Sequence, residues 1–242
     1  MSCLIDIHCH LADYADSYDI KTLESSSEII HVSTALNKRE MAMHEEKGID
    51  YWFAGLHPRE IKMTHQDIIE FFIAFPYDKV IGIGEIGIDR NYPDLDKQLS
   101  LLKIQLDRAW EYELPTLYHL VGHEYSFIKL HKTLKLENMK IIHGFNSSYE
   151  VFKELDKLGF YFSLSKRVLY NPKRIQVVKA ILESKRFFLE SDAPNHAELD
   201  EVKRLAKCLE INYNIDMIEL KEIQVKNFAD LLGETSESTS KK

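Results

Sequence analysis

The sequence predicts an α/β fold, specifically a (β/α)8 barrel of parallel strands surrounded by helices. Short apolar runs alternate with longer segments of helical period, which is typical of repeated βα units. Eight such runs in 242 residues fit a barrel of about 250 residues. An open doubly wound sheet is less favoured, because "GIGEIG" (82–87) is only loosely similar to a dinucleotide fingerprint and places Glu85 where a phosphate would approach.

The eight predicted strands are short runs of apolar, mostly β-branched or aromatic residues. In chain order they are "CLIDIH" (3–8), "EIIHVS" (28–33), "DYWFAGL" (50–56), "KVIGIGEI" (79–86), "PTLYHL" (115–120), "KIIHGF" (140–145), "FYFSLS" (160–165) and "RFFLES" (186–191). The clearest helix is 95–113, because its apolar residues recur at three- and four-residue steps. That spacing predicts a helix with one face against the sheet.

The alternation runs on without a linker, so we predict one hydrolase-type barrel domain over 1–232. The remaining residues, "GETSESTSKK" (233–242), are polar and of low complexity, and we expect a disordered tail. Hydrophobic residues make up 45% and charged residues 29% of the chain, which suits a globular protein. The formal charge of -8 argues against nucleic-acid binding by bulk electrostatics but leaves room for a local cationic site or bound metal.

The cysteines and the hydropathy pattern bear on the cellular compartment. Cys3, Cys9 and Cys208 are too few and too scattered for a disulfide framework, which suits a reducing compartment. The sequence has neither a signal-peptide pattern nor an apolar run near the roughly 20 residues that span a bilayer. We therefore expect a cytoplasmic protein that needs no membrane and no obligate protein partner.

Two histidines follow the first apolar run, in "LIDIHCHLAD" (4–13). In a barrel the carboxyl ends of the strands form the functional face. Because side chains alternate along a strand, we expect Asp6, His8 and His10 to point to the same side and converge in the barrel mouth. Each histidine alone could be an ordinary hydrogen-bonded residue, but a pair of neutral imidazoles is a natural metal chelate.

Four further residues come at the same relative position of other predicted strands. Glu85 alone could cap a helix and His143 alone could be a core histidine, but chance placement of all six groups is much less probable than a shared site. Four imidazoles and two carboxylates are typical of a centre with two divalent cations, one carboxylate reaching between them. The predicted metal ligands are His8, His10, Glu85, His119, His143 and Asp192.

The motifs "DIHCH", "GLHP", "IGEIGID", "LPTLYH", "IIHGF" and "LESDAP", with the helix that carries Gln98 and Gln105, resemble the TatD family of metal-dependent DNases. They run in family order from residue 6 to about 194. The resemblance implies an amidohydrolase-superfamily barrel that hydrolyses phosphodiester bonds in DNA. It also implies that His8, His10, Glu85 and Asp192 surround one metal, and that Glu85 bridges to a second metal held by His119 and His143. A bridging glutamate differs from the carboxylated lysine of the urease and dihydroorotase pattern.

Three residues are candidates for binding a substrate phosphate. His57 and Arg59 lie in "GLHPRE", and the resemblance suggests this role for the histidine; Arg90 lies in "DRNY" (89–92). Arg59 could equally be a solvated loop residue, and Arg90, Asn91 and Tyr92 could belong to an ordinary polar loop. Glu190, on the same face as Asp192, is expected to support a ligand and not to bind metal itself.

The sequence also departs from the usual family pattern. Members commonly have an arginine two positions after the fifth-strand histidine, where this chain has Val121, and "HGFNSS" replaces the common "HCFSG". These changes keep the metal ligands and remove one expected cation. A binuclear hydrolase of a small ester or amide is therefore the alternative function, and a noncatalytic metal-binding or docking protein is a more distant one.

The mechanism expected from two cations uses a shared water of lowered pKa as the nucleophile, with Asp192 as general base beside the bridging Glu85. The sequence has no G-x-S-x-G elbow and no activated cysteine motif for covalent catalysis. Mg, Mn, Zn, Co and Fe all suit mixed imidazole and carboxylate ligands. The expected substrate is DNA that is single-stranded or has unpaired ends, shortened from an end, because an intact duplex is too broad for a barrel mouth.

Overall fold

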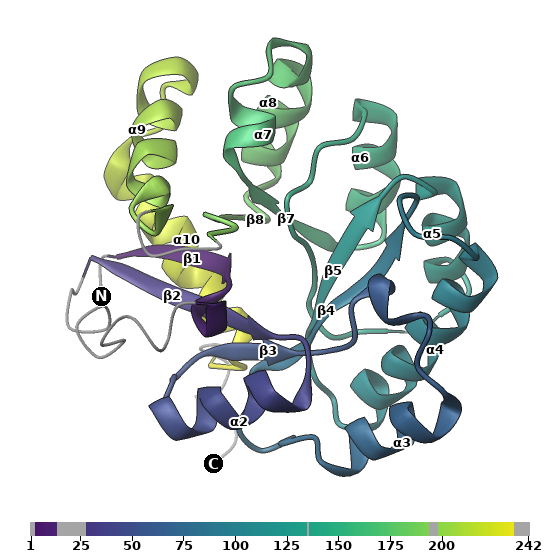
Figure 1. Ribbon diagram of the computed structural model, residues 1–242. Coiled ribbons are helices and arrows are strands. Elements are labelled where there is room, and N and C mark those ends of the chain that lie inside the picture. The colour runs from purple at the N-terminus through teal and green to yellow at the C-terminus, as the bar shows by residue number, and fades with distance from the viewer. Residues whose placement is uncertain (1–2, 14–27, 135, 194–197, 235–242) are drawn as a thin grey trace, which may run out of the picture.

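The computed structural model describes residues 3–13, 28–134, 136–193 and 198–234. Eight parallel strands form a closed barrel in which each strand pairs with the next and β8 pairs with β1. Figure 1 shows the strands at the centre of the molecule. The predicted (β/α)8 fold is confirmed. The strands are β1 (Leu4–Cys9), β2 (Ile29–Ala35), β3 (Trp52–Ala54), β4 (Gly82–Asp89), β5 (Thr116–Val121), β6 (Lys140–Ile142), β7 (Phe160–Leu164) and β8 (Phe187–Leu189).

Helices surround the barrel (Figure 1). They are α2 (Lys38–Lys47), α3 (His65–Ile73), α4 (Leu95–Glu111), α5 (Glu124–His131), α6 (Tyr149–Lys157), α7 (Lys166–Leu169), α8 (Ile175–Ser184), α9 (Glu201–Tyr213) and α10 (Met217–Leu231), with short 3-10 turns η1 (Leu11–Asp13), η2 (Pro58–Glu60) and η3 (Pro172–Arg174). The helix predicted over 95–113 is α4. None of the helices in the described ranges combines the length and the hydrophobicity that a membrane span needs.

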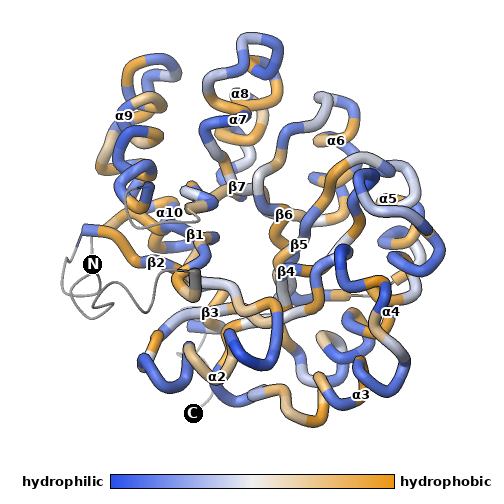
Figure 2. The backbone as a smooth tube through the Cα atoms, in the orientation of Figure 1, coloured by the Kyte–Doolittle hydropathy of each residue, from blue (hydrophilic) through white to orange (hydrophobic). Residues whose placement is uncertain are grey.

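The apolar residues form two cores, one on each side of the strands. The larger core lies between the strands and the surrounding helices, which carry both hydrophobic and hydrophilic residues along their turns (Figure 2). The smaller core contains strand residues such as Ile5, Leu117 and Ile141 together with Phe228 and Leu231 of α10. Helix α10 therefore closes one end of the barrel, and the carboxyl ends of the strands remain for the site.

Strand β4 ends three residues later than predicted, at Asp89 instead of residue 86. The added residues Gly87–Asp89 pair with His119–Val121 of β5. Glu85 therefore lies within a strand and not at its end. The apolar pattern did not reveal this, because two glycines interrupt the run "GIGEIGID" and only the pairing partner defines its length.

Strand pairing is irregular at two places, between Asp6 and Cys9 of β1 and between Gly84 and Ile86 of β4. A bulge breaks the alternation of side chains along a strand. Ile5 belongs to the core inside the barrel, so Asp6 points to the opposite side. The expectation that Asp6 converges with His8 in the barrel mouth is therefore wrong.

Asp6 instead joins the first and last strands of the barrel, where it pairs with Leu189. Its carboxylate accepts hydrogen bonds from the backbone N–H of Ser191 at 2.8 Å and from the Ser191 hydroxyl at 2.7 Å. His31 of β2 contacts the same carboxylate at 3.1 Å. Asp6 thus holds the segment that immediately precedes Asp192.

The three cysteines are free and buried. Cys9 donates to the carbonyl of Val32 at 3.4 Å, and burial raises its pKa well above the ordinary value. Cys9, Asp6 and His31 could offer ligand atoms to one metal, but Asp6 already accepts the three hydrogen bonds described above. We assign these residues a role in holding the strands together. Most of the tail predicted at 233–242 lies outside the described residues.

Two buried histidines outside the barrel mouth should make the fold less stable in acid. Burial lowers the pKa of His44 and of His131 from 6.5 to about 4. Between these pH values the unfolded chain binds more protons than the folded one, so the free energy of unfolding should fall as the pH is lowered from about 6.5 towards 4. Each histidine should contribute a slope of up to about 1.4 kcal/mol per pH unit.

Urea denaturation across this pH range measures the effect. His131 donates from Nδ1 to the Phe127 carbonyl at 2.9 Å, and its Nε2 lies 3.1 Å from the Tyr118 hydroxyl. Glutamine can make both contacts and does not titrate, so His131→Gln should flatten the pH dependence. An unchanged slope in His131→Gln would show that His131 is not responsible.

Candidate metal centre

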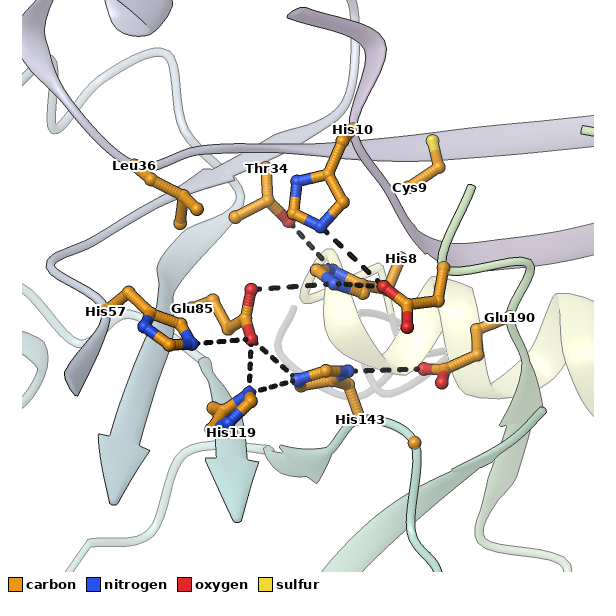
Figure 3. A network of polar contacts seen from close by, with 12 residues as sticks. His8, Cys9, His10, Thr34, Leu36, His57, Glu85, His119, His143 and Glu190 are labelled. Atoms are coloured by element: carbon orange, nitrogen blue, oxygen red, sulfur yellow. Dashed lines mark hydrogen bonds and ion pairs between the residues drawn. The ribbon is translucent and has the colours of Figure 1, made fainter. Parts of the chain in front are cut away.

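Glu85 lies at the middle of the barrel mouth, with histidines of several strands around it (Figure 3). One carboxylate oxygen, Oε1, is 2.6 Å from His119 Nδ1, 2.8 Å from His143 Nε2 and 3.6 Å from His57 Nε2. The other oxygen, Oε2, is 3.6 Å from His8 Nε2. The two oxygens of one carboxylate therefore face two separate sets of imidazoles.

Asp192 completes the side of the centre that contains His8. Its Oδ1 atom lies 3.7 Å from His8 Nε2 and 3.7 Å from His10 Nε2. Asp192 has a φ of 50°, a conformation that costs a residue with a Cβ about 1 kcal/mol or more. Two backbone hydrogen bonds to the end of β1 and the residue after it hold Asp192 there, from Asp192 N–H to the His8 carbonyl and from His10 N–H to the Ala193 carbonyl.

The orientation of His8 suits a metal ligand. Its Nδ1 contacts Thr34 Oγ1 at 3.0 Å, so Nδ1 can carry the proton and leave a lone pair on Nε2. His8 Nε2 is buried and has no hydrogen-bond partner among the described residues. A divalent cation between His8, His10 and the two carboxylates would satisfy this atom, so the donor set fits the implied metal.

His119 and His143 suit a second cation. His119 Nε2 lies 3.0 Å from Asp89 Oδ2, so it can donate to this carboxylate and leave its Nδ1 lone pair facing Glu85. His119 Nδ1 and His143 Nε2 are 3.1 Å apart, and both lie close to Glu85 Oε1. Two nitrogens and one oxygen thus converge as they would around a shared cation.

His57 faces the same carboxylate as a donor. Its Nδ1 accepts a hydrogen bond from the backbone N–H of Arg59 at 3.0 Å, so the neutral ring carries its proton on Nε2. Burial lowers the pKa of His57 to about 4, which keeps the ring neutral near pH 7. A protonated Nε2 cannot bind a metal, so His57 is better suited to hydrogen-bond a substrate oxygen.

Helix α4 positions two of the loops that carry these residues. Gln105 donates to the carbonyl of Leu56 at 2.9 Å and accepts from its N–H at 2.7 Å, which fixes the chain just before His57. Gln98 does the same for Asp89, donating to its carbonyl at 3.1 Å and accepting from its N–H at 2.7 Å. Both glutamine side chains are fully buried. The helix therefore sets the geometry of the loops after β3 and β4.

The site carries negative charge where cations would bind. Burial opposes ionisation of Glu85, but His143 and His119 outweigh it and hold the Glu85 pKa well below its usual value. Burial likewise opposes ionisation of Asp192, whose pKa is nevertheless held below its usual value by His10 and His8. Burial disfavours charge on His143 too, yet the Glu85 carboxylate raises its pKa to about 10, so a cation bound at His143 would displace a proton from the ring. Both carboxylates are therefore ionised near pH 7.

Glu190 lies beside His143. Its Oε2 atom is 3.8 Å from His143 Nδ1 and accepts a hydrogen bond from Ser163, and burial raises its pKa to about 7. This placement agrees with a supporting role for Glu190, on the His143 side of the centre. Sequence reasoning missed Thr34 and the pairing of Asp89 with His119. The position of Asp89 in the same apolar run as Glu85 was the available signal.

The two predicted substrate arginines are placed differently from His57. The Arg59 side chain is 44% exposed and its Nε lies 3.0 Å from Glu60 Oε1, so it is engaged by a neighbouring residue. Arg90 is exposed and follows the end of β4. The structure therefore brings the six predicted ligands and His57 together, and leaves both arginines at the periphery.

Comparison with known proteins gives one family. The sequence model of the family described as TatD related DNase matches residues 5–239. The uncharacterized metal-dependent hydrolase YabD of Bacillus subtilis is 27% identical over 249 residues, covering 96% of this chain and 97% of YabD. A Vairimorpha ceranae protein is 25% identical to this chain over 201 residues, and its provisional name is deoxyribonuclease TATDN1 homolog. The match covers 79% of this chain and 72% of the Vairimorpha protein.

Solved structures agree in fold. The crystal structure of YJJV, a TatD homolog from Escherichia coli, has a TM-score of 0.79 at 22% identity and covers 96% of this chain and 99% of its own. A TatD family hydrolase from Entamoeba histolytica has a TM-score of 0.81 at 17% identity, with coverage of 97% and 99%. At these identities the likeness establishes the barrel alone.

Proposed function

Because this chain belongs to the TatD-related DNase family, we propose that it is a deoxyribonuclease that hydrolyses phosphodiester bonds in the barrel mouth. Its relatives include metal-dependent hydrolases that match it over nearly its whole length. The observation that carries this proposal is the placement of Glu85. Its two oxygens face separate sets of donors, His8 on one side and His119 with His143 on the other. This is the arrangement that a bridging ligand of two cations requires.

The proposed ligands divide between the two oxygens of Glu85. His8, His10 and Asp192 would hold one divalent cation with Oε2, and His119 and His143 the other with Oε1. Mg, Mn, Zn, Co and Fe are all compatible with these donors. Bound there, the cations would stabilise charge on the phosphoryl group and lower the pKa of a water.

The side chains around the cations would orient the phosphodiester and move the proton. Asp192 is ionised and its side chain is 33% exposed, so it can take a proton from the attacking water. His57 would donate its Nε2–H to a phosphoryl oxygen, where negative charge increases in the transition state. Cys9 is unsuited to act as a nucleophile, because it is fully buried and its pKa is raised.

The net charge of -8 limits how DNA can be bound. Attraction would come from the two cations and from Arg59 and Arg90, with a hydrogen bond from the neutral His57, so the protein would contact few phosphates. A single strand or an unpaired end can reach the barrel mouth, whereas an intact duplex is too broad. We therefore propose exonucleolytic shortening of single strands.

The salt dependence of DNA binding tests this proposal. The affinity for a single-stranded oligonucleotide should fall only gently with salt, with a slope that corresponds to about two to four phosphate contacts. Fluorescence anisotropy measures the slope, and gel electrophoresis of end-labelled DNA measures shortening, which chelation should abolish. The proposal fails if single-stranded DNA survives with Mg, Mn, Co and Zn each supplied.

A binuclear hydrolase of a small ester or amide is the second candidate. Two observations favour it: Val121 carries no charge beside the site, and the Arg59 side chain lies against Glu60. A panel of small esters and amides, assayed with the same metals as the DNA, separates the two candidates. Turnover of the panel without hydrolysis of DNA would establish the second.

A further inference from the structure

We propose that Arg90 and Tyr92, in the segment after β4, form a nucleotide-binding arm beside the metal centre. Tyr92 would stack on a base next to the scissile phosphate, and Arg90 would bind a neighbouring phosphate. This inference rests on the proposed nuclease function and names the part of the site that recognises a nucleotide.

The arm begins inside the centre. Asp89 of β4 contacts His119 at 3.0 Å. Three residues later, the Tyr92 ring meets the His57 ring edge to face, with centroids 5.7 Å apart and an interplanar angle of 86°. The His57 ring is in turn 4.4 Å from that of His119. The segment therefore borders the side of the centre that faces Glu85 Oε1. A DNA strand bound there would leave the centre over the loops after β3, β4 and β5.

The backbone of the arm is fixed by hydrogen bonds. Gln98 donates to the carbonyl of Tyr92 at 2.9 Å as well as to that of Asp89. The Asp89 carboxylate accepts from the N–H of Asn91 at 2.7 Å, and Tyr92 N–H donates to the Asp89 carbonyl at 3.1 Å. A loop held in this way loses little conformational entropy when a ligand binds, which favours affinity.

Arg90 is held by its main chain and by its aliphatic stem. Its N–H donates to the carbonyl of Val121 at 2.8 Å. The stem packs across Gly122, where an added Cβ would lie 2.8 Å from Arg90 Cδ and 3.1 Å from Arg90 Cβ. Arg90 is exposed, and its guanidinium makes no salt bridge with any residue in the part of the chain that the structure describes. The charge is therefore available to a ligand.

The chemistry of the two side chains matches a nucleotide. Tyr92 is half-buried, so part of its ring remains accessible, and an aromatic ring stacks on any base. A guanidinium binds a phosphate with two parallel hydrogen bonds. A small ester or amide has neither a base nor a second phosphate. The arm would therefore favour a strand of at least two nucleotides over a small molecule.

Steady-state kinetics of the metal-loaded enzyme tests the arm with two substrates, a single-stranded oligonucleotide and 4-nitrophenyl methyl phosphate. Tyr92→Leu should raise KM for the oligonucleotide about tenfold, and Arg90→Gln by a similar factor, about the loss expected for one stacked base or one phosphate contact. The kinetics of the small diester should stay unchanged. Tyr92→Phe keeps the ring and should behave like the wild type.

Matched controls lie elsewhere on the surface. Tyr112 follows the last turn of α4 and is 45% exposed, and Arg108 lies one turn before it. Tyr112→Leu and Arg108→Gln should leave KM unchanged for both substrates.

The outcomes separate the arm from the proposed function. If the wild type shortens DNA but Tyr92→Leu and Arg90→Gln leave KM unchanged, or raise it equally for both substrates, the arm is wrong and the nuclease function stands. If the wild type cleaves the small diester and leaves DNA intact, the nuclease function is wrong and the arm is rejected with it.

Discussion

Replacing Glu85 with alanine should abolish nearly all hydrolysis and leave the protein with one divalent cation instead of two. The reason is that Glu85 is the carboxylate whose Oε1 faces His119 and His143 while its Oε2 faces His8. Without it, neither the shared ligand nor the charge that attracts the second cation remains. Metal-ion stabilisation contributes several kcal/mol, so the rate should fall on the order of a thousandfold or more.

Elemental analysis after titration with metal gives the stoichiometry, and thermal unfolding followed by circular dichroism shows whether the barrel is intact. Glu111→Ala, at the exposed end of α4, is the matched control and should keep both cations and full turnover. Two bound cations and normal activity in Glu85→Ala would refute the site assignment. Saturation of the wild-type protein at one cation, with several metals tried, would refute the binuclear centre.

Asp192→Asn should have a different effect, a loss of rate with little loss of metal. The asparagine carbonyl oxygen can still face His8 and His10, but it is not basic enough to take a proton. Removing a general base costs a factor on the order of 100 or more, so kcat should fall by about that amount. Single-turnover measurements at saturating metal isolate this step.

Asp200→Asn, an exposed carboxylate just before α9, controls for the change of charge and should be fully active. A loss of metal in Asp192→Asn as large as in Glu85→Ala would mean that Asp192 acts mainly as a ligand. An unchanged kcat would remove Asp192 from the proton transfer altogether.

The side chains that sequence places together at the barrel mouth, and that the structure brings together there, follow the regular alternation of strand side chains. Leu117 and Ile141 point into the barrel core, and the residues two positions later, His119 and His143, reach the mouth. The strand number was equally visible, because each apolar run is followed by a helical segment. Local patterns were sufficient here because the strands are regular.

The features that sequence did not predict depend on pairing between distant strands. The bulges near His8 and Glu85 change which side chains face the mouth, and only the register with β2 and β5 defines them. The bonds from Ser191 to Asp6 join residues 185 positions apart, beyond the reach of any local pattern. Arg59 was a reasonable candidate for contact with a phosphate from its position in the chain, but its orientation towards Glu60 depends on side-chain packing.

The pairing of the first strand with the last sets an order for maturation on the ribosome. Glu85, His119 and His143 all emerge before β8, so their half of the centre can assemble while translation continues. His8 and His10 must wait for Asp192, because β1 has an unpaired edge until β8 (Phe187–Leu189) arrives to close it. Until then this edge is open to chaperones or to other nascent chains, which exposes β1 to misassembly during synthesis.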